Sequence, residues 1–267
     1  MVTLHNGDCL NIMPTLPDKS IDLILCDLPY GTTACKWDTV IPFEPLWEQY
    51  KRIIKPNGVI VLFGSQPFTT ALIASNIKMF REEIIWLKNK SASGMRATQS
   101  HLKTHENIIV FSESGSYTYN PQKWVVTEKQ FLTQRKTMSV YGETNNIYGN
   151  LKRNRKQDDG TRNPISVVAF RVPITTAKSK NYTQDVDVRV HPTQKPVELL
   201  EYLIKTYTNE GDTVLDNCMG SGSTGVASVN LNRKFIGIEL NETYYNIASD
   251  RIADAQECNK YRPKDLF

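Results

Sequence analysis

The chain has 267 residues and a formal net charge of +4, with 40% hydrophobic and 22% charged residues. This length supports one α/β domain with an insertion and leaves little room for two large domains. The balanced composition excludes a disordered or fibrous chain, and no apolar run reaches the roughly 18 residues of a membrane span. We therefore expect a globular cytoplasmic protein that does not associate with membranes.

The first part of the sequence alternates between strand-like and helix-like segments. Residues 21–27 form an apolar run that ends in Asp27 and continues into Leu28-Pro29-Tyr30, which predicts a buried parallel strand followed by a loop. In α/β sheets, the chemistry takes place at the carboxyl ends of such strands. The other elements predicted here are a helix over 44–55, a strand over 59–63, a helix over 68–77, and strands over 83–87 and 107–111.

The alternation stops between residues 112 and 190, and we interpret this polar region as an insertion or separate lobe. Residues 121–163 contain nine Lys and Arg against four Asp and Glu. Such an excess suits a lobe that faces phosphates, because cationic side chains displace counterions from nucleic acid. A solvated basic loop is equally compatible with the charge alone. The candidate contacts to nucleic acid are Lys152, Arg153, Arg155 and Lys156.

The last part of the chain contains a glycine-rich loop between a predicted strand and a predicted helix. Residues 220–225 read Gly-Ser-Gly-Ser-Thr-Gly, which fits G-x-G-x-x-G, and Glu239 ends the next strand. Backbone without Cβ atoms can approach a ligand closely, and a carboxylate one strand over can accept hydrogen bonds from a ribose. The elements predicted here are a helix that ends near 210, a strand over 213–217, a helix over 223–230, a strand over 234–239 and a helix over 242–255.

This loop is compatible with several nucleoside ligands. No Lys follows the glycines, which argues against NTP hydrolysis. A nicotinamide oxidoreductase would need further strands after Glu239, and only 28 residues remain. The missing strands must come from the front of the chain, so the strand over 21–27 is expected beside the cofactor strand over 213–217. The predicted fold is a doubly wound, mostly parallel α/β sheet in permuted order.

Seven motifs in this order resemble the β group of DNA amino-methyltransferases. They are Gly7-Asp-Cys9, Asp27-Leu-Pro-Tyr30, Phe63-Gly-Ser-Gln-Pro-Phe68, His105-Glu106, His191-Pro-Thr-Gln-Lys-Pro196, Asp216-Asn-Cys-Met-Gly-Ser-Gly222 and Gly237-Ile-Glu239. The resemblance implies a Rossmann-like methyltransferase fold that uses S-adenosylmethionine. It divides the chain into a catalytic half (1–111), an inserted target-recognition region (112–190) and a cofactor-binding half (191–267).

The resemblance also assigns roles to residues of this cofactor site. Asp8 and Cys9 would contact the adenine of the cofactor, and Lys195 would face its carboxylate. The residues that would hold the methionine and ribose are Gly220, Ser221, Gly222, Ser223, Thr224 and Glu239. The remaining cofactor positions are Asp27, Asp216 and Cys218.

Two positions depart from the family pattern. Leu28 stands where the tetrapeptide Asp-Pro-Pro-Tyr has its first Pro, and Asn217-Cys218 stands where Pro-Phe is usual. Leu28 keeps the backbone carbonyl that the chemistry uses, whereas Cys218 removes an aromatic contact to the cofactor.

The tetrapeptide suits methyl transfer to an exocyclic amino group, whose lone pair is delocalised into the ring of the base. The Asp27 carboxylate and the Leu28 carbonyl would each accept one N–H and so direct the nitrogen lone pair at the methyl group. Pro29 would fix this backbone, and Tyr30 would stack on a base flipped out of the duplex. A helix-capping acid and a packed loop aromatic are the alternatives for Asp27 and Tyr30, which the cofactor motifs disfavour.

We therefore expect a DNA methyltransferase that acts on adenine N6 in double-stranded DNA. N4-cytosine methylation is the alternative, in which the tetrapeptide more often begins with Ser. A nicotinamide oxidoreductase and a catalytically silent DNA-binding module are the rivals from other classes. The resemblance allows a homodimer and a cognate restriction endonuclease as partners. No metal is expected, because His101 and His105 lack a third ligand.

Overall fold

The computed structural model describes residues 1–32, 38–92, 94, 97–125, 160–173 and 194–261. The chain divides into a larger unit, Met1–Asn120 with Ser166–Phe267, and a smaller unit, Pro121–Ile165. In the described part of the smaller unit, β6 (Trp124–Val125) pairs antiparallel with β7 (Thr161–Arg162). The predicted DNA contacts at residues 152–156 lie outside the described residues.

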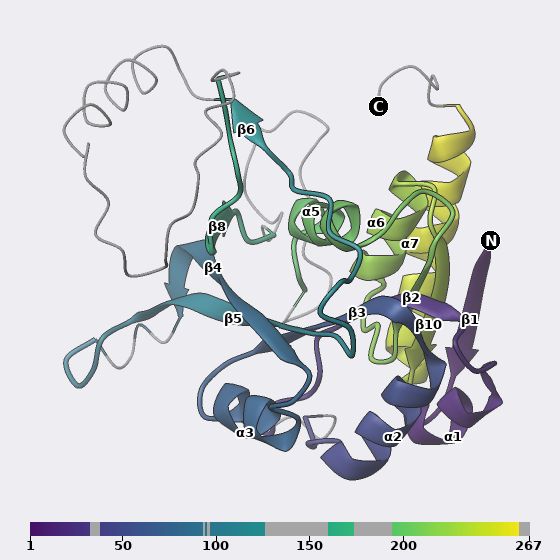
Figure 1. The fold of residues 1–267 in the computed structure, drawn as a ribbon, viewed down its shortest axis with the longest axis horizontal. Helices are drawn as coiled ribbons and strands as arrows, with labels where there is room; N and C mark the ends of the chain where they lie inside the picture. The colour runs from purple at the N-terminus through teal and green to yellow at the C-terminus, as the bar shows by residue number, and fades with distance from the viewer. Residues whose placement is uncertain (33–37, 93, 95–96, 126–159, 174–193, 262–267) are drawn as a thin grey trace, which may run out of the picture. The chain divides into compact units, whose positions relative to one another are not determined.

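The larger unit is built on one eight-stranded sheet (Figure 1). Its strands, in spatial order, are β1 (Val2–Asn6), β10 (Lys234–Glu239), β9 (Thr213–Asp216), β2 (Ile21–Cys26), β3 (Ile54–Gly64), β5 (Lys103–Phe111), β4 (Phe80–Ala92) and β8 (Val167–Phe170). The first five run parallel to one another, β5 is antiparallel to both of its neighbours, and β4 and β8 pair in parallel.

The permuted strand order is confirmed by the pairing of β2 with β9. Leu23 and Ile24 lie opposite Val214 and Leu215, which are almost two hundred residues later in the chain. The predicted α/β fold with a mostly parallel sheet is therefore confirmed. The sequence analysis missed β1, which adds to the far edge of the sheet beside β10.

Helices cover both faces of this sheet. The helices are α1 (Cys9–Ile12), the 3-10 turn η1 (Met13–Thr15), α2 (Phe43–Ile53), α3 (Phe68–Ser75), α5 (Val197–Tyr207), α6 (Ser223–Asn230) and α7 (Glu242–Lys260). Alternate residues of β2 point to opposite faces. Leu23 and Leu25 pack with the α5, α6 and α7 side, whereas Ile24 and Cys26 pack with the α1, α2 and α3 side. Since both faces are covered, the strand is apolar throughout.

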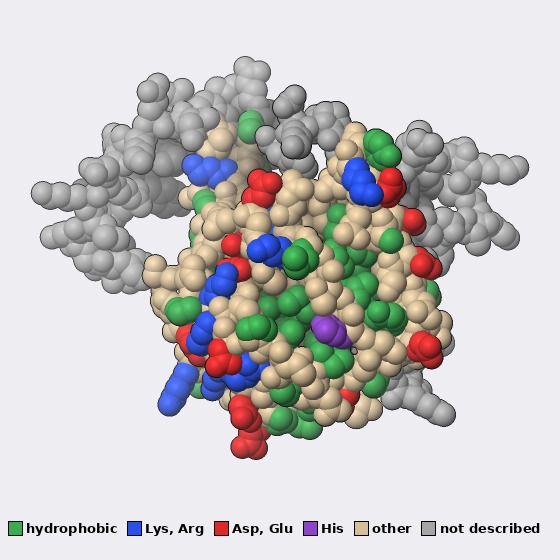
Figure 2. Space-filling model, turned by 90° about the vertical axis from the view of Figure 1, so that its right-hand side faces the viewer, with side chains coloured by type: hydrophobic (Ala, Val, Ile, Leu, Met, Phe, Trp, Pro, Cys, Tyr) green, Lys and Arg blue, Asp and Glu red, His purple; other side chains and the backbone are tan. Residues whose placement is uncertain are grey.

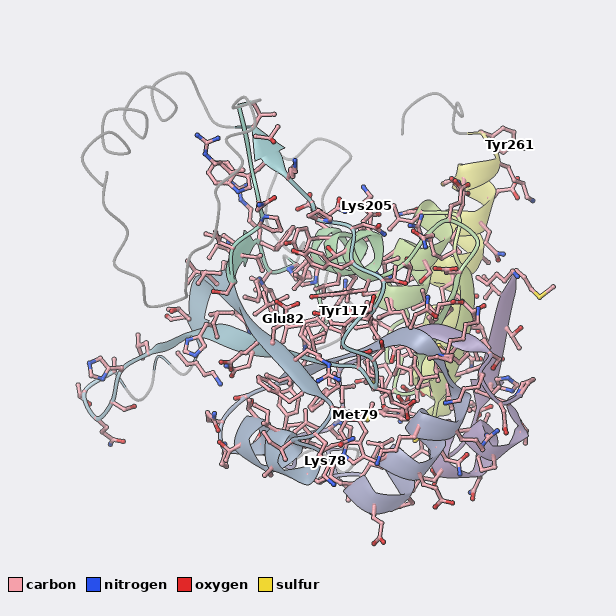
Figure 3. The ribbon with its side chains drawn as sticks, viewed as in Figure 1. Lys78, Met79, Glu82, Tyr117, Lys205 and Tyr261 are labelled. Atoms are coloured by element: carbon pink, nitrogen blue, oxygen red, sulfur yellow. The ribbon has the colours of Figure 1, made fainter. Side chains whose placement is uncertain are left out.

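Two segments of the region predicted as an insertion belong to the larger unit. β8 pairs with β4, and the backbone N–H groups of Thr118 and Asn120 donate to the carbonyls of Asn57 and Thr206. Tyr117 lies beside Glu82, whose carboxylate also accepts a hydrogen bond from the hydroxyl of Tyr207 at 2.9 Å (Figure 3). Asn120 donates its side-chain amide to the carbonyl of Thr208 at 3.0 Å. These contacts are between residues distant in the sequence, which explains why no local pattern indicated them.

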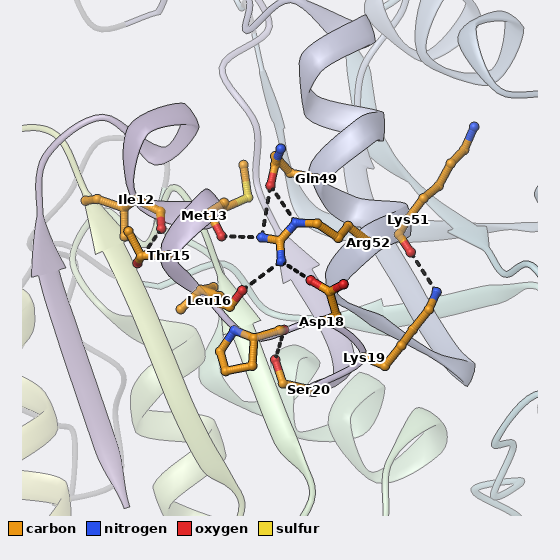
Figure 4. Close-up of polar contacts among 11 residues, drawn as sticks. Ile12, Met13, Thr15, Leu16, Asp18, Lys19, Ser20, Gln49, Lys51 and Arg52 are labelled. Carbon is orange, nitrogen blue, oxygen red and sulfur yellow. Dashed lines mark hydrogen bonds and ion pairs between the residues drawn. The ribbon is translucent and has the colours of Figure 1, made fainter.

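Arg52 connects α2 to the turn that follows α1 (Figure 4). Its guanidinium donates to the carbonyls of Met13 and Leu16, each at 2.8 Å, and also to the Asp18 carboxylate. Gln49 accepts two further bonds from it, at 3.0 and 3.1 Å. The planar fork of Arg suits several acceptors at once, so this residue holds the segment after β1 in place.

The face of the molecule toward β1 and α7 has hydrophobic side chains in its middle and charged side chains around them (Figure 2). Both signs of charge are present there, so the described residues on this face form no basic surface. None of the helices in the described ranges combines the length and the apolar character that crossing a bilayer requires.

Candidate active site

The carboxyl ends of the parallel strands open into one cavity of about 610 Å³. The segments after β1, β2, β9 and β10 all reach it, because parallel strands end at the same edge of a sheet. The segment before α5 and the strand β5 contribute further lining residues. This volume falls within the range of roughly 300–1,000 Å³ that small-molecule pockets occupy.

One side of the cavity is formed by the glycine loop between β9 and α6. Gly220 donates its backbone N–H to Glu239 Oε2 at 2.8 Å, and Asn241 donates to Glu239 Oε1 at 2.8 Å. The Glu239 carboxylate is thereby fixed at the end of β10. Gly220 has a φ of +52°, and a Cβ at this position would meet no atom within 4 Å, so the backbone is open to a ligand there.

Gly222 has a different role in the same loop. Its φ is +80°, and a Cβ at this position would lie 2.9 Å from the Cβ of Ala248 in α7. Gly222 does not line the cavity. A side chain is excluded here by the close packing of α6 on α7, so this glycine shapes the loop from behind.

The floor between the two sides contains Asp216 and several thiols. Burial raises the pKa of Asp216 to about 6, although Thr224 and the backbone N–H of Cys218 donate hydrogen bonds to it. Hydrogen bonding to Cys218 and burial raise the pKa of Cys9, and burial raises the pKa of Cys26 to about 12. These thiols therefore stay protonated and act as small buried side chains.

The opposite side of the cavity contains charged groups around Asp27. The hydroxyl of Tyr30 donates to Asp27 Oδ1 at 2.6 Å, and Lys195 Nζ donates to Asp27 Oδ2. Lys195 Nζ also lies 3.4 Å from Glu106 Oε2 and 4.9 Å from the centre of the Phe63 ring. The Tyr30 ring lies 5.0 Å from that of Phe68.

These neighbours determine the charge state of the group. Burial raises the pKa of Asp27, Lys195 opposes this rise, and the charge of Glu106 adds to it. Burial alone would lower the pKa of Lys195, but Asp27 and Glu106 raise it above its usual value. Lys195 is therefore a cation at neutral pH, and its charge favours the ionised form of Asp27.

Asp38 fixes the start of the segment that follows Tyr30. Asp38 accepts the backbone N–H groups of Gly31 and Thr32, each at 2.9 Å. Leu28 is only 3% exposed, because its side chain packs into the core on the α1, α2 and α3 side. The departure from the usual Pro is thus accommodated by burial of the Leu side chain, while the backbone lines the cavity.

The cavity brings together nearly all the predicted catalytic and cofactor residues. The predicted catalytic and cofactor positions that line it are Asp8, Cys9, Asp27, Leu28, Pro29, Tyr30, Lys195, Asp216, Cys218, Gly220, Ser221, Ser223, Thr224 and Glu239. Lys195 was expected to face a cofactor carboxylate, and here it contacts the two protein carboxylates. In the described ranges, His, Cys, Asp and Glu form no group of three or more suited to a metal ion.

Among the lining residues to which the sequence analysis assigned no role are Glu106, Asp38 and Gln194. Glu106 follows His105 in a quoted motif, but its position on β5, antiparallel to β3, could not be read from that dipeptide. Asp38 and Gln194 are only 8% exposed, and burial of a polar side chain is the signal that would have marked them.

Comparisons with known proteins show the family of the chain. The sequence model of the DNA methylase family N6_N4_Mtase matches residues 21–250. The type II methyltransferase M.BglII of Bacillus subtilis is 28% identical over 97% of this chain and 71% of its own length. The DNA adenine methyltransferase YhdJ of Escherichia coli is also 28% identical, over 94% of this chain and 82% of its own length.

Solved structures share the fold. The complex of M1.HpyAVI with SAM superposes with a TM-score of 0.61 at 23% identity, covering 94% of this chain and 99% of that one. The cytosine-N4-specific PvuII DNA methyltransferase superposes with a TM-score of 0.63 at 15% identity, covering 97% of this chain and 92% of that one. With the family match extending over most of the sequence, the chain belongs to the N6/N4 DNA methylase family, the amino-methyltransferases of DNA.

Proposed function

We propose that this chain transfers a methyl group from S-adenosylmethionine to the N6 atom of an adenine flipped out of double-stranded DNA. One observation carries the proposal: Asp27 after β2 and Glu239 at the end of β10, with the glycine loop after the intervening β9, line the same cavity. A donor held on one side and an amino group held on the other would meet within it.

The residues present suit S-adenosylmethionine. Glu239 has both oxygens fixed by backbone N–H groups, and each retains lone pairs for the hydroxyls of a ribose. Open backbone at Gly220 and the small side chains of Ser221 and Cys218 leave room beside it. When bound, this cofactor supplies an electrophilic methyl group on a sulfonium. Asp8, Asp216, Ser223, Thr224 and Cys9 complete the proposed cofactor side.

The chain's own part in the reaction is to orient the amino group. The Asp27 carboxylate and the Leu28 carbonyl accept its two N–H groups, so the nitrogen lone pair points across the cavity. Pro29 holds the backbone of this turn. The half-buried Tyr30 presents its ring to the base, while its hydroxyl keeps Asp27 from rotating.

The choice of adenine rests on Asp27 as the first residue of the tetrapeptide. N4-cytosine methylation is the second candidate, and the likeness to the cytosine-N4-specific PvuII enzyme favours it. Both amino groups would use the same two acceptors, so the cofactor side is the same in either case.

The test is incubation of the chain with unmethylated genomic DNA and methyl-labelled S-adenosylmethionine. Nucleosides are then separated by mass spectrometry, and modified positions are mapped by sequencing. We expect labelled N6-methyladenine at a defined site. Labelled N4-methylcytosine would show that the target base is cytosine and not adenine. If no label enters DNA although calorimetry shows cofactor binding, DNA is not the substrate.

The proposed DNA contacts are Lys152, Arg153, Arg155 and Lys156, and their support is the charge excess of their region. The division at 1–111, 112–190 and 191–267 remains a proposal for the functional halves and the target-recognition region. A second copy of the chain and a cognate endonuclease remain predictions, to be tested by sedimentation and by restriction assays of the source cells.

A further inference from the structure

Asp27 and three charged side chains from other elements form a chain of ion pairs. Lys195 precedes α5, Glu106 lies on β5 and Lys88 lies on β4. Lys195 contacts Asp27 and Glu106, and Lys88 donates to Glu106 Oε1. The quartet contains two acids and two bases, so its formal charge is zero. Such a set stays ionised in a buried site, since each charge has an opposite neighbour.

Glu106 differs from Asp27, Lys195 and Lys88 because one of its carboxylate oxygens lacks a hydrogen bond of good geometry. Oε1 accepts from Lys88, whereas the buried Oε2 has no partner at good hydrogen-bonding geometry among the described residues. Lys195 Nζ lies 3.4 Å from it, close enough for an ion pair. A buried acceptor without a hydrogen bond is costly, so Oε2 can gain from a donor that moves closer to it.

Asp27, in contrast, has both oxygens engaged. Tyr30 occupies Oδ1, and Lys195 occupies Oδ2. In the proposed reaction the Asp27 carboxylate must accept an N–H from the base. The ammonium of Lys195 competes with the base for that carboxylate. A shift of Lys195 Nζ toward Glu106 Oε2 would free Asp27 Oδ2 to accept from the base. The same shift would give Glu106 Oε2 a hydrogen bond. No proton is transferred in this shift.

We infer that Glu106 is a positioning residue, whose Oε2 receives Lys195 Nζ when the amino group of the target base binds Asp27. This inference rests on the proposed function. Lys88 holds the other oxygen of Glu106 and so keeps Oε2 directed at Lys195. The Phe63 ring beneath Nζ, 4.9 Å away, provides a surface along which the ammonium can move.

The inference makes opposite predictions for the two neighbours of Lys195. The charge of Glu106 raises the pKa of Asp27, as burial does, and Lys195 opposes both. The cations that face Glu106 are Lys195, Lys88 and, more distantly, Lys103, and Asp27 and Tyr30 also lie within range of its charge. Removing the Glu106 charge leaves Lys195 on Asp27 alone. Removing the Lys88 charge draws Lys195 toward Glu106.

The deciding experiment measures kcat and KM for DNA across pH in the wild type, Glu106→Gln and Lys88→Met. We expect Glu106→Gln to lower kcat about tenfold, the scale of one hydrogen bond to a charged group, and to move the acidic limb of the kcat profile to lower pH. Lys88→Met should move the same limb to higher pH. Glu83→Gln is the matched control, because Glu83 bonds Asn107 on the same pair of strands outside the cavity.

Each outcome bears on the inference. Wild-type kcat with an unmoved limb in Glu106→Gln would overturn it, as would shifts of both variants in one direction. If Glu106→Gln does not fold by circular dichroism, Lys88→Met decides alone, and an unmoved limb then overturns the inference. Absence of DNA methylation by the wild type, in contrast, would overturn the proposed function itself.

Discussion

The two sides of the cavity are built in different ways. On the glycine-loop side, Glu239 is held by backbone N–H groups from residues close to it in the fold, and the loop shape comes from glycines with positive φ. On the Asp27 side, the groups are charged side chains from four separate elements. A ligand meets fixed backbone on one side and a movable ammonium on the other.

This difference has a functional consequence. Backbone donors keep their positions whether or not a ligand is present, so the glycine-loop side is organised in advance. The charged side must exchange partners when a substrate arrives, because the oxygens of Asp27 are already occupied. We therefore expect variants of the charged side to change turnover, and variants of the glycine loop to change cofactor binding and stability.

The largest expected effect comes from Asp27→Asn. The substitution keeps the shape of the side chain but removes the charge that the amino group needs, so kcat should fall by at least about 10²-fold. Lys195 would still face Glu106, which preserves the fold. Calorimetry should show cofactor affinity within a few fold of the wild type. Turnover at the wild-type rate would refute the mechanism proposed for the charged side.

Asp216 at the end of β9 should make stability depend on pH. Its pKa of about 6 in the folded chain exceeds that of an exposed Asp, so the folded state binds the proton more tightly. This contribution is fully present below pH 4 and is lost as the pH rises through about 6. Asp216→Asn should therefore gain about 2 kcal/mol over the wild type between pH 4 and 7. Urea unfolding at both pH values measures it, and a constant difference would contradict the assignment.

Two glycines of one loop form a matched pair. Gly220→Ala should cost about 1–2 kcal/mol, from the left-handed backbone alone. Gly222→Ala should cost a further 1–3 kcal/mol or so, because its Cβ would meet Ala248. Thermal unfolding of both variants tests this order. An equal loss of stability in the two variants would mean that α6 and α7 can separate at no cost in free energy. The glycine loop would then not be rigid.

A smaller effect is expected at Arg52, which supports the cavity from outside. Arg52→Lys keeps the charge but cannot bond two carbonyls and a carboxylate at once, so we expect a loss of about 1–2 kcal/mol. Urea unfolding measures this loss, with Lys51→Arg on the same helix as the control. A stability equal to that of the wild type would show that the turn after α1 keeps its conformation without the Arg52 hydrogen bonds.

The smallest single-residue effects should come from the basic stretch of residues 152–156. Replacing Arg153 and Arg155 by Gln should weaken binding of DNA and lower the slope of log affinity against log salt by about 1 for each phosphate that is no longer neutralised. Fluorescence anisotropy at several salt concentrations measures this slope. A slope equal to that of the wild type would remove the stretch from the DNA interface.

The glycine-loop side could be predicted because its information is local. The spacing of the glycines, the strand before them and the acid at the end of the next strand lie within residues 213–239, and the observed elements agree with the prediction within a residue or two. The permuted order followed from counting the residues left after Glu239. Strands such as β2 could also be predicted from the sequence, because burial on both faces requires a continuous apolar run.

The remainder needed the tertiary structure. Nothing near Glu106 in the sequence indicates that it shares an ammonium with Asp27, since the three residues come from β5, the end of β2 and the segment before α5. The attachment of β8 to β4 is likewise a pairing of distant segments with no local pattern. By itself the sequence determined the permuted pairing of β2 with β9 and the elements around the glycine loop, and it supplied the motifs on which the proposed site rests. The folded chain decided which charges meet, because electrostatic pairing depends on distance in space and not on separation along the chain.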